Sequence, residues 1–138
     1  MRLLLACLIF LHLAACANDQ PTIELLVDVD VAHAVAIDLV VVEDEQLFRQ
    51  LLVTQAPDWF ENKPAYQVMG SVTVRSYQLP PMASVTDAAF PPSRATGVKR
   101  LVIVLGSDGP VVIETSDQLT RVVIHEDTVS VQESGPGF

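Results

Sequence analysis

The chain has 138 residues, of which 50% are hydrophobic, with 8 basic and 17 acidic residues. This length and apolar content are sufficient for one domain with a buried core. The net charge of −9 and the scatter of the few basic residues disfavour binding to nucleic acid or to anionic lipid headgroups, because both require a positive surface.

Residues 1–15 have the pattern of a secretory signal peptide. A basic residue, Arg2, precedes an almost wholly apolar run over residues 3–13, and the small residues Ala14 and Ala15 follow it. This order of basic start, apolar core and small residues is typical of a segment that is cleaved after export. The apolar run is too short for a permanent membrane span, which needs about 20 residues.

The cysteine after this segment indicates the kind of signal. The string Leu13-Ala14-Ala15-Cys16 resembles a bacterial lipobox. That resemblance implies cleavage before Cys16, a diacylglycerol on its sulfur and a third acyl chain on its new amino group. Two or more chains anchor a protein stably, because each buried methylene contributes about 0.8 kcal/mol. A plain signal peptide with a chance cysteine, or an uncleaved anchor, is the alternative.

Cleavage would change the cysteine count and the charge of the chain. Cys7 would be lost, so the acylated Cys16 would be the only cysteine and no disulfide is expected within the mature protein. Arg2 would be lost as well, leaving 7 of the 8 basic residues against 17 acidic ones and moving the net charge from −9 to −10. That charge permits a basic protein partner. In enteric-type bacteria an Asp directly after the acylated cysteine tends to retain a lipoprotein in the inner membrane. Here Ala17 follows the cysteine and the Asp is at position 19, so by resemblance to that rule the outer membrane is favoured.

A short polar tether over residues 16–21 precedes two predicted strands. Residues 22–31 alternate between apolar and acidic side chains, as a half-buried strand does. Residues 34–42 are rich in β-branched side chains, and Asp38 interrupts one face of this second strand. The alternation here and in the later strands predicts these core residues: Val27, Val29, Ile37, Leu39, Val74, Val102, Val104, Val112, Val122 and Ile124.

The hydrophobic period then changes to that of a helix. Asp44 is a suitable N-cap, and the leucines of residues 45–54 recur at helical spacing. This helix should end before Pro57, because proline cannot continue it. Residues 58–61 are predicted to form a further helical turn that is closed by Pro64.

The remaining chain predicts five strands and one long loop. Residues 72–79 form a strand, whereas residues 80–96, with two proline pairs, are predicted to be an extended crossover loop. Seven short strands with close turns predict a mainly β domain, an antiparallel β-sandwich over residues 22–133 with a helical insertion near residues 44–63. The last four strands are expected at residues 100–105, 111–115, 119–125 and 128–132, before a tail at residues 134–138.

No motif in the sequence supports catalysis. There is no Gly-Xaa-Ser-Xaa-Gly elbow, phosphate loop, dinucleotide fingerprint or pair of Cys-Xaa-Xaa-Cys motifs. Asp28, Asp30 and His33 could be combined into a metal site. An outward strand face that carries carboxylates explains the two aspartates more simply. Asp38 and His125 are expected to pair across the sandwich as a buried acid and its partner, and as a dyad they would lack a nucleophile. We therefore expect no enzyme, no metal and no cofactor.

Trp59 and Phe60 are the candidate partner-binding residues. They are adjacent aromatic residues in the helical insertion of a chain that is only 6% aromatic, and Trp is enriched in binding hot spots. Neighbouring positions on a helix point about 100° apart, so one side chain can be buried while the other is exposed. The alternative is that both side chains close the open end of the sandwich as core residues.

The order of these segments carries one family resemblance. A lipobox cysteine is followed by the strand of residues 36–44, a leucine-rich helix, the string Asp58-Trp59-Phe60 and the strand of residues 72–79. This layout resembles the TssJ-type lipoproteins of type VI secretion systems and their uncharacterised relatives. In that family a transthyretin-like sandwich, which is also immunoglobulin-like in its two layers, hangs from the outer membrane into the periplasm. It binds the periplasmic region of an inner-membrane secretion protein.

The resemblance implies a non-catalytic adaptor in an envelope secretion complex. The alternative is a free-standing envelope lipoprotein that binds a small ligand or an envelope polymer in a pocket at the end of the sandwich. The family has an arginine-tyrosine-leucine type of strand before its helix, whereas the similar string Arg75-Ser76-Tyr77-Gln78-Leu79 follows the helix here. No binding residue is therefore transferred from the family.

Overall fold

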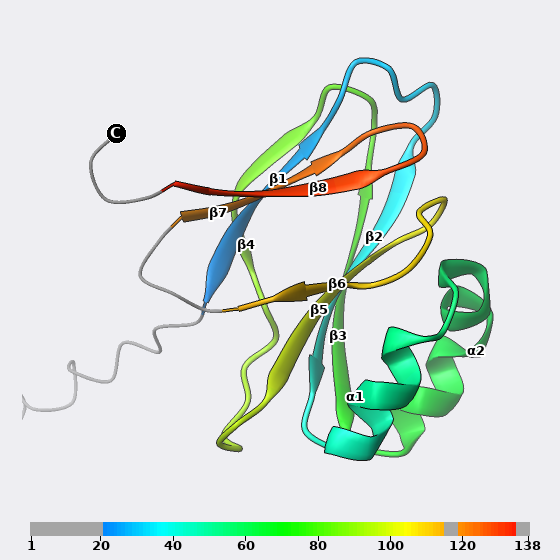
Figure 1. Cartoon of the computed structure of the whole chain (residues 1–138), viewed down its shortest axis with the longest axis vertical. Helices are drawn as coiled ribbons and strands as arrows, with labels where there is room; N and C mark the ends of the chain where they lie inside the picture. The colour runs from blue at the N-terminus through cyan, green and yellow to red at the C-terminus, as the bar shows by residue number, and fades with distance from the viewer. Residues whose placement is uncertain (1–20, 115–118, 135–138) are drawn as a thin grey trace, which may run out of the picture.

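A computed structural model of the chain describes residues 21–114 and 119–134 (Figure 1). The predicted signal peptide, residues 16–20 of the tether and residues 135–138 of the tail lie outside the described residues. The elements, in chain order, are β1 (Thr22–Val27), β2 (Val35–Val42), α1 (Glu45–Leu52), α2 (Ala56–Val68), β3 (Val72–Leu79), β4 (Ser84–Ala89), β5 (Lys99–Val104), β6 (Val111–Ile113), β7 (Leu119–Ile124) and β8 (Val129–Ser134).

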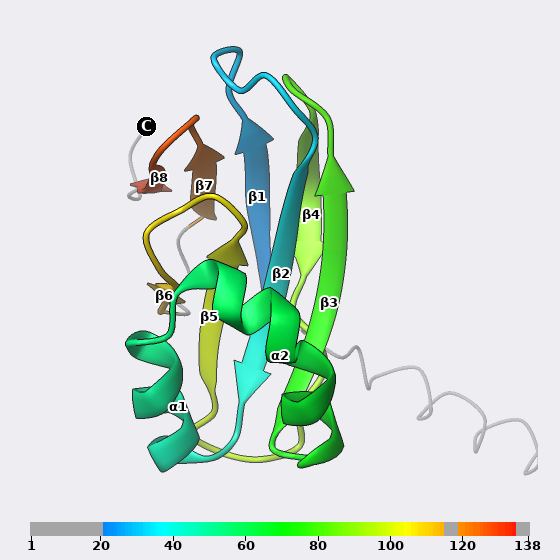
Figure 2. The ribbon, with the colours of Figure 1, turned by 90° about the vertical axis from the view of Figure 1, so that its right-hand side faces the viewer.

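The strands form two four-stranded sheets that pack face to face. The strand orders are β4-β1-β7-β8 and β3-β2-β5-β6. Neighbouring strands are antiparallel except for β1 and β7, which run parallel with Leu25 opposite Val122. Both helices lie on the outer face of the second sheet (Figure 2). The predicted β-sandwich with a helical insertion is confirmed, and the parallel pair is an addition to the prediction.

Apolar side chains from both sheets fill the space between them. Leu25 of β1 and Leu39 of β2 are fully buried there, and Phe90 joins them from the segment after β4. The Phe90 N–H donates to the Pro21 carbonyl at 3.1 Å, which ties that segment to the start of β1. Val74 is partly buried, on the helix side of the second sheet. The predicted core residues that are buried are Val27, Ile37, Leu39, Val102, Val104, Val122 and Ile124.

Two predicted core residues are exposed, so the prediction was wrong for them. Val29 is 72% exposed because β1 ends at Val27 and the chain then turns, although the apolar alternation continues in the sequence. Val112 is 41% exposed, since Val111 and Ile113 pack against the core and side chains alternate along a strand.

Strand β2 is buried on both faces, which explains its nearly continuous apolar sequence. Leu39 and its alternate neighbours face the other sheet, whereas Val40 and Val42 face the helices. Helix α1 begins as predicted, with the Asp44 carboxylate accepting a hydrogen bond from the Leu47 N–H at 2.8 Å. The helices thus cover an apolar outer face of the sheet.

Helix α2 is longer than the predicted single turn. Pro57 occupies the first turn, where no N–H donor is needed, and Pro64 lies inside the helix instead of closing it. Pro64 is exposed, whereas Trp59 before it and Tyr66 after it pack into the apolar cluster between the helices and the second sheet. The helical insertion therefore extends to Val68 rather than to residue 63.

The predicted crossover loop of residues 80–96 contains a strand. Strand β4 pairs antiparallel with β1 along an edge of the first sheet. The proline pairs lie outside the strand, before Ser84 and after Ala89. The exposed side chains of the strand itself are polar. Within the described parts of the chain, no helix has the length and apolar character needed to cross a membrane.

Candidate functional site

The helical insertion places the two candidate partner-binding residues in different environments. Trp59 is fully buried against the second sheet, and its ring stacks on that of Tyr66 with the centroids 5.4 Å apart. Phe60 is only partly buried, and the Lys63 Nζ lies 5.3 Å from its ring centroid. Trp59 is therefore a core residue with no surface for a partner, whereas Phe60 remains a candidate.

A buried carboxylate lies directly beneath α2. Asp38 is 1% exposed, and its Oδ2 accepts a hydrogen bond from the Trp59 Nε1 at 2.9 Å and pairs with the Lys63 Nζ at 3.1 Å. Lys63 also donates to the Ser76 hydroxyl of β3 at 3.3 Å. These contacts join α2 to two strands of the second sheet.

The predicted pairing of Asp38 with His125 is wrong. Asp38 lies on the face of β2 that the helices cover, together with Val40 and Val42. His125 follows β7 in the other sheet and pairs with Asp28 instead. The alternation of β2 points Asp38 away from the sandwich interior, so the two side chains are separated by the second sheet.

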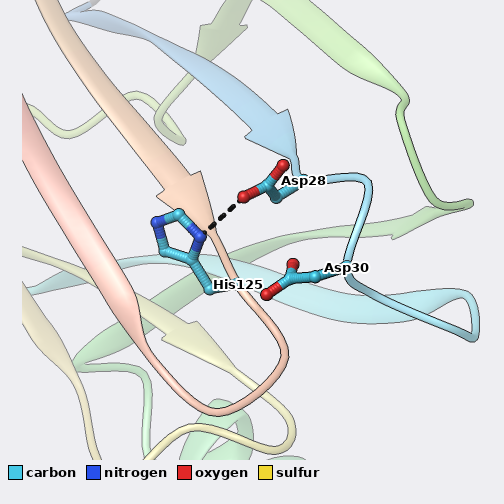
Figure 3. A group of neighbouring side chains, drawn as sticks. All are labelled: Asp28, Asp30 and His125. Atoms are coloured by element: carbon cyan, nitrogen blue, oxygen red, sulfur yellow. Dashed lines mark hydrogen bonds and ion pairs between the residues drawn. The ribbon is translucent and has the colours of Figure 1, made fainter.

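A second polar cluster lies where β1 and β7 end (Figure 3). The His125 Nδ1 is 2.8 Å from the Asp28 Oδ2, and the Asp30 carboxylate turns toward the same ring from the loop after β1. One ligand atom from each of the three residues lies within 4.8 Å of the others. Sequence reasoning grouped the two aspartates with His33, but the parallel pairing of β1 with β7 brings His125 beside them.

Two hollows lie on the surface of the described residues. One, of about 340 Å³, is at the same end of the sandwich and is lined by residues 31–36 together with Gln78, Leu105 and Glu126. The other, of about 490 Å³, lies beside the edge strand β6, where Phe48 contributes an apolar wall and Lys99 and Arg100 contribute positive charge. Burial lowers the pKa of the Arg100 guanidinium from its ordinary value. Neither hollow was predicted by residue, although a pocket at the sandwich end was part of the alternative hypothesis.

Comparison with known proteins gives a structural answer only. No protein-family model matches the chain, and no curated protein matches its sequence. The chain is similar in structure to the T6SS lipoprotein TssJ1 from Pseudomonas aeruginosa, with a TM-score of 0.60 and 9% identity over 83% of this chain and 95% of that one. It is also similar to the C-terminal domain of the T6SS protein TssM from EAEC, with a TM-score of 0.58 and 13% identity over 80% of this chain and 98% of that one. The chain therefore has the fold of a TssJ-type lipoprotein domain.

Proposed function

We propose that this protein is a lipid-anchored, non-catalytic adaptor of a type VI-like secretion complex in the bacterial envelope. The observation that carries the proposal is the fold that the chain shares with the T6SS lipoprotein TssJ1. The TssM domain has the same fold, so two components of type VI systems resemble this chain. Of these two components, the lipoprotein TssJ1 is the favoured functional counterpart, because this chain contains the lipobox-like string Leu13-Ala14-Ala15-Cys16.

The proposed lipid anchor is on Cys16 and holds the protein on the outer membrane, with the sandwich facing the periplasm. Cys16 precedes Thr22, the first residue of β1, by only a few positions. A chain of this length spans at most about 20 Å when it is fully extended, at roughly 3.3–3.6 Å per residue. The proposed anchor would therefore keep the sandwich close to the membrane surface.

The proposed partner is the periplasmic region of an inner-membrane secretion protein, as the family resemblance implies. The acidic chain, with 17 acidic against 8 basic residues before cleavage, would attract a basic surface and speed the encounter. The helical insertion offers exposed apolar side chains at Val53, Val68 and Met69, besides the partly buried Phe60. Neither structural neighbour is named as an enzyme, which supports a non-catalytic role.

Metabolic palmitate labelling and membrane fractionation test the anchor. We expect Cys16→Ser to abolish labelling, with the protein released from the membrane or left as an unprocessed precursor. Cys7→Ser is the matched control, since Cys7 lies in the segment that cleavage would remove. We expect this variant to be labelled and fractionated like the wild type. Unchanged labelling of Cys16→Ser would contradict the lipoprotein assignment.

Co-purification from detergent-solubilised envelopes tests the adaptor role in the same strains. We expect the wild-type protein to retain an inner-membrane secretion component. The alternative function, binding of a small ligand or envelope polymer, has one observation in its favour, the hollow of about 340 Å³ at the sandwich end. Recovery of the protein with such a molecule and without any secretion component would favour that alternative over the adaptor.

A further inference from the structure

We propose that Asp28, Asp30 and His125 bind one divalent transition-metal ion of the Zn²⁺ type at the end of the sandwich. The three side chains come from the loop after β1 and the turn after β7, and they face one another (Figure 3). This inference does not depend on the adaptor role. It replaces the expectation from the sequence that the chain has no metal site, which was based on His33 and not on His125.

Backbone hydrogen bonds hold two of the three ligands in place. The Asp28 N–H donates to the Ile124 carbonyl at 2.9 Å, and the His125 N–H donates to the Thr128 carbonyl at 2.8 Å. The Val29 N–H donates to the Asp28 Oδ1, which leaves the Oδ2 directed at the imidazole. Two of the three ligands are therefore arranged before a metal arrives, so most of the reorganisation on binding would be at Asp30.

The donor atoms suit zinc in type and spacing. Zinc takes imidazole nitrogen and carboxylate oxygen at about 2.0–2.2 Å, so two ligands of a tetrahedral ion lie about 3.3 Å apart. The His125 Nδ1 and the Asp28 Oδ2 are 2.8 Å apart, and all three ligand atoms lie within 4.8 Å of one another. Small side-chain shifts would bring them to this spacing, and three protein ligands would leave a fourth position for water.

Ser130 supplies the outer partner that a metal-binding imidazole usually has. Its hydroxyl oxygen is 3.3 Å from the Nε2 of His125, on the ring nitrogen that faces away from Asp28. When the Nδ1 binds a metal, the Nε2 carries the proton and donates to this hydroxyl. Such a partner fixes the tautomer and the orientation of the ring.

The charge of the cluster also favours a cation. The ion pairs of lysine and arginine within residues 21–114 and 119–134 involve Glu45, Asp38 and Glu24, and none involves Asp28 or Asp30. Glu126 adds another carboxylate to the same turn, next to His125. A divalent ion would neutralise both aspartates.

Titration of the full-length lipoprotein in detergent, after removal of metal with a chelator, tests the proposal. We expect Zn²⁺ to bind with one-to-one stoichiometry in calorimetry, and Co²⁺ to give the visible absorption of a tetrahedral site. Asp28→Asn, Asp30→Asn and His125→Gln should each weaken Zn²⁺ binding by more than Ser130→Ala does. Ser130→Ala should weaken it by about tenfold, the lower end of the usual range for outer partners.

His33→Gln and Asp87→Asn are the matched controls, because both residues are exposed and lie outside the cluster. We expect both controls to bind Zn²⁺ like the wild type. Thermal melts of all variants in chelator show that they fold, and Asn at position 28 keeps the oxygen that accepts from the Val29 N–H. Failure of the wild type to bind Zn²⁺, or equal binding by His125→Gln and His33→Gln, would overturn the proposal and leave an ordinary Asp28–His125 hydrogen bond.

Discussion

Trp59 and Phe60 are adjacent in the sequence but have different environments. The indole ring is fully buried and donates to Asp38, whereas the Phe60 ring is partly buried beside Lys63. The sequence predicted that one of two neighbouring helical side chains can be buried and the other exposed. It did not reveal that a carboxylate from β2 would be the hydrogen-bonding partner of the buried one, because that contact depends on how α2 packs on the sheet.

Trp59→Ala should destabilise the protein by about 3–5 kcal/mol, because it removes a large core side chain. It also removes one of the two donors to the buried Asp38 carboxylate. Phe60→Ala should leave the stability closer to that of the wild type. If Phe60 is a contact of the partner, that change should weaken the complex by more than about 2 kcal/mol. Urea denaturation and a pull-down on both variants measure the two effects.

One result for each residue would contradict these roles of Trp59 and Phe60. A Trp59→Ala variant with wild-type stability would contradict the placement of the indole ring in the core. A Phe60→Ala variant that melts normally and retains full binding would remove Phe60 from the partner surface. The remaining exposed apolar residues of the insertion, such as Val53 and Met69, would then be the next positions to change.

Helix α2 contains two prolines in different structural positions. Pro57 lies in the first turn, where its missing N–H has no helical partner, but Pro64 lies in the interior. An interior proline costs about 3 kcal/mol relative to alanine, because it removes a hydrogen bond and clashes with the preceding turn. The sequence pattern predicted that Pro64 would end the helix, and packing of the helix on the sheet overrides that preference.

Pro64→Ala should therefore stabilise the protein. The gain in the helix is up to about 3 kcal/mol, offset by about 0.4–1 kcal/mol because alanine makes the unfolded chain more flexible. Pro57→Ala is the matched control, with the same cost in the unfolded chain and no hydrogen bond to restore. Equilibrium urea denaturation compares the two variants. A Pro64→Ala protein that is no more stable than Pro57→Ala would mean that Pro64 does not destabilise α2.

The elements that the sequence predicted well are those with a strong hydrophobic period. Strands β2, β5 and β7 and the start of α1 fall within a residue or two of their predicted bounds. Strand β4 was missed because its polar outward residues resemble a loop and proline pairs lie on both sides of it. The Asp28–His125 contact could not be predicted, since it requires the parallel pairing of β1 with a strand almost a hundred residues later.

At the scale of the whole molecule, the two sheets have interior and edge strands with different protection. β1 and β7 lie inside the first sheet and β2 and β5 inside the second, with β4, β8, β3 and β6 at the edges. Backbone amides that are buried and paired on both sides open only with the larger part of the domain, whereas edge amides open locally. The domain should thus behave as a protected centre with less stable margins.

Hydrogen exchange followed by mass spectrometry measures this gradient. We expect peptides from β1, β2 and β5 to exchange most slowly, and peptides from β4 and β8 to exchange faster under the same conditions. Peptides from the β1–β2 loop are an internal reference for fast exchange, because they contain few backbone hydrogen bonds. If β1 exchanged as fast as β8, its place between two strands would be wrong.

The position of β1 also determines how the domain responds to mechanical load. If Cys16 carries the proposed lipid anchor, a pull on that anchor enters the domain through β1, which begins at Thr22. Because β4 and β7 pair with both sides of this strand, a force along the strand would have to shear two ladders of hydrogen bonds at once. An edge strand pulled away from its sheet would instead lose its bonds one after another. Held on both sides, β1 would therefore resist such a pull better than an edge strand would.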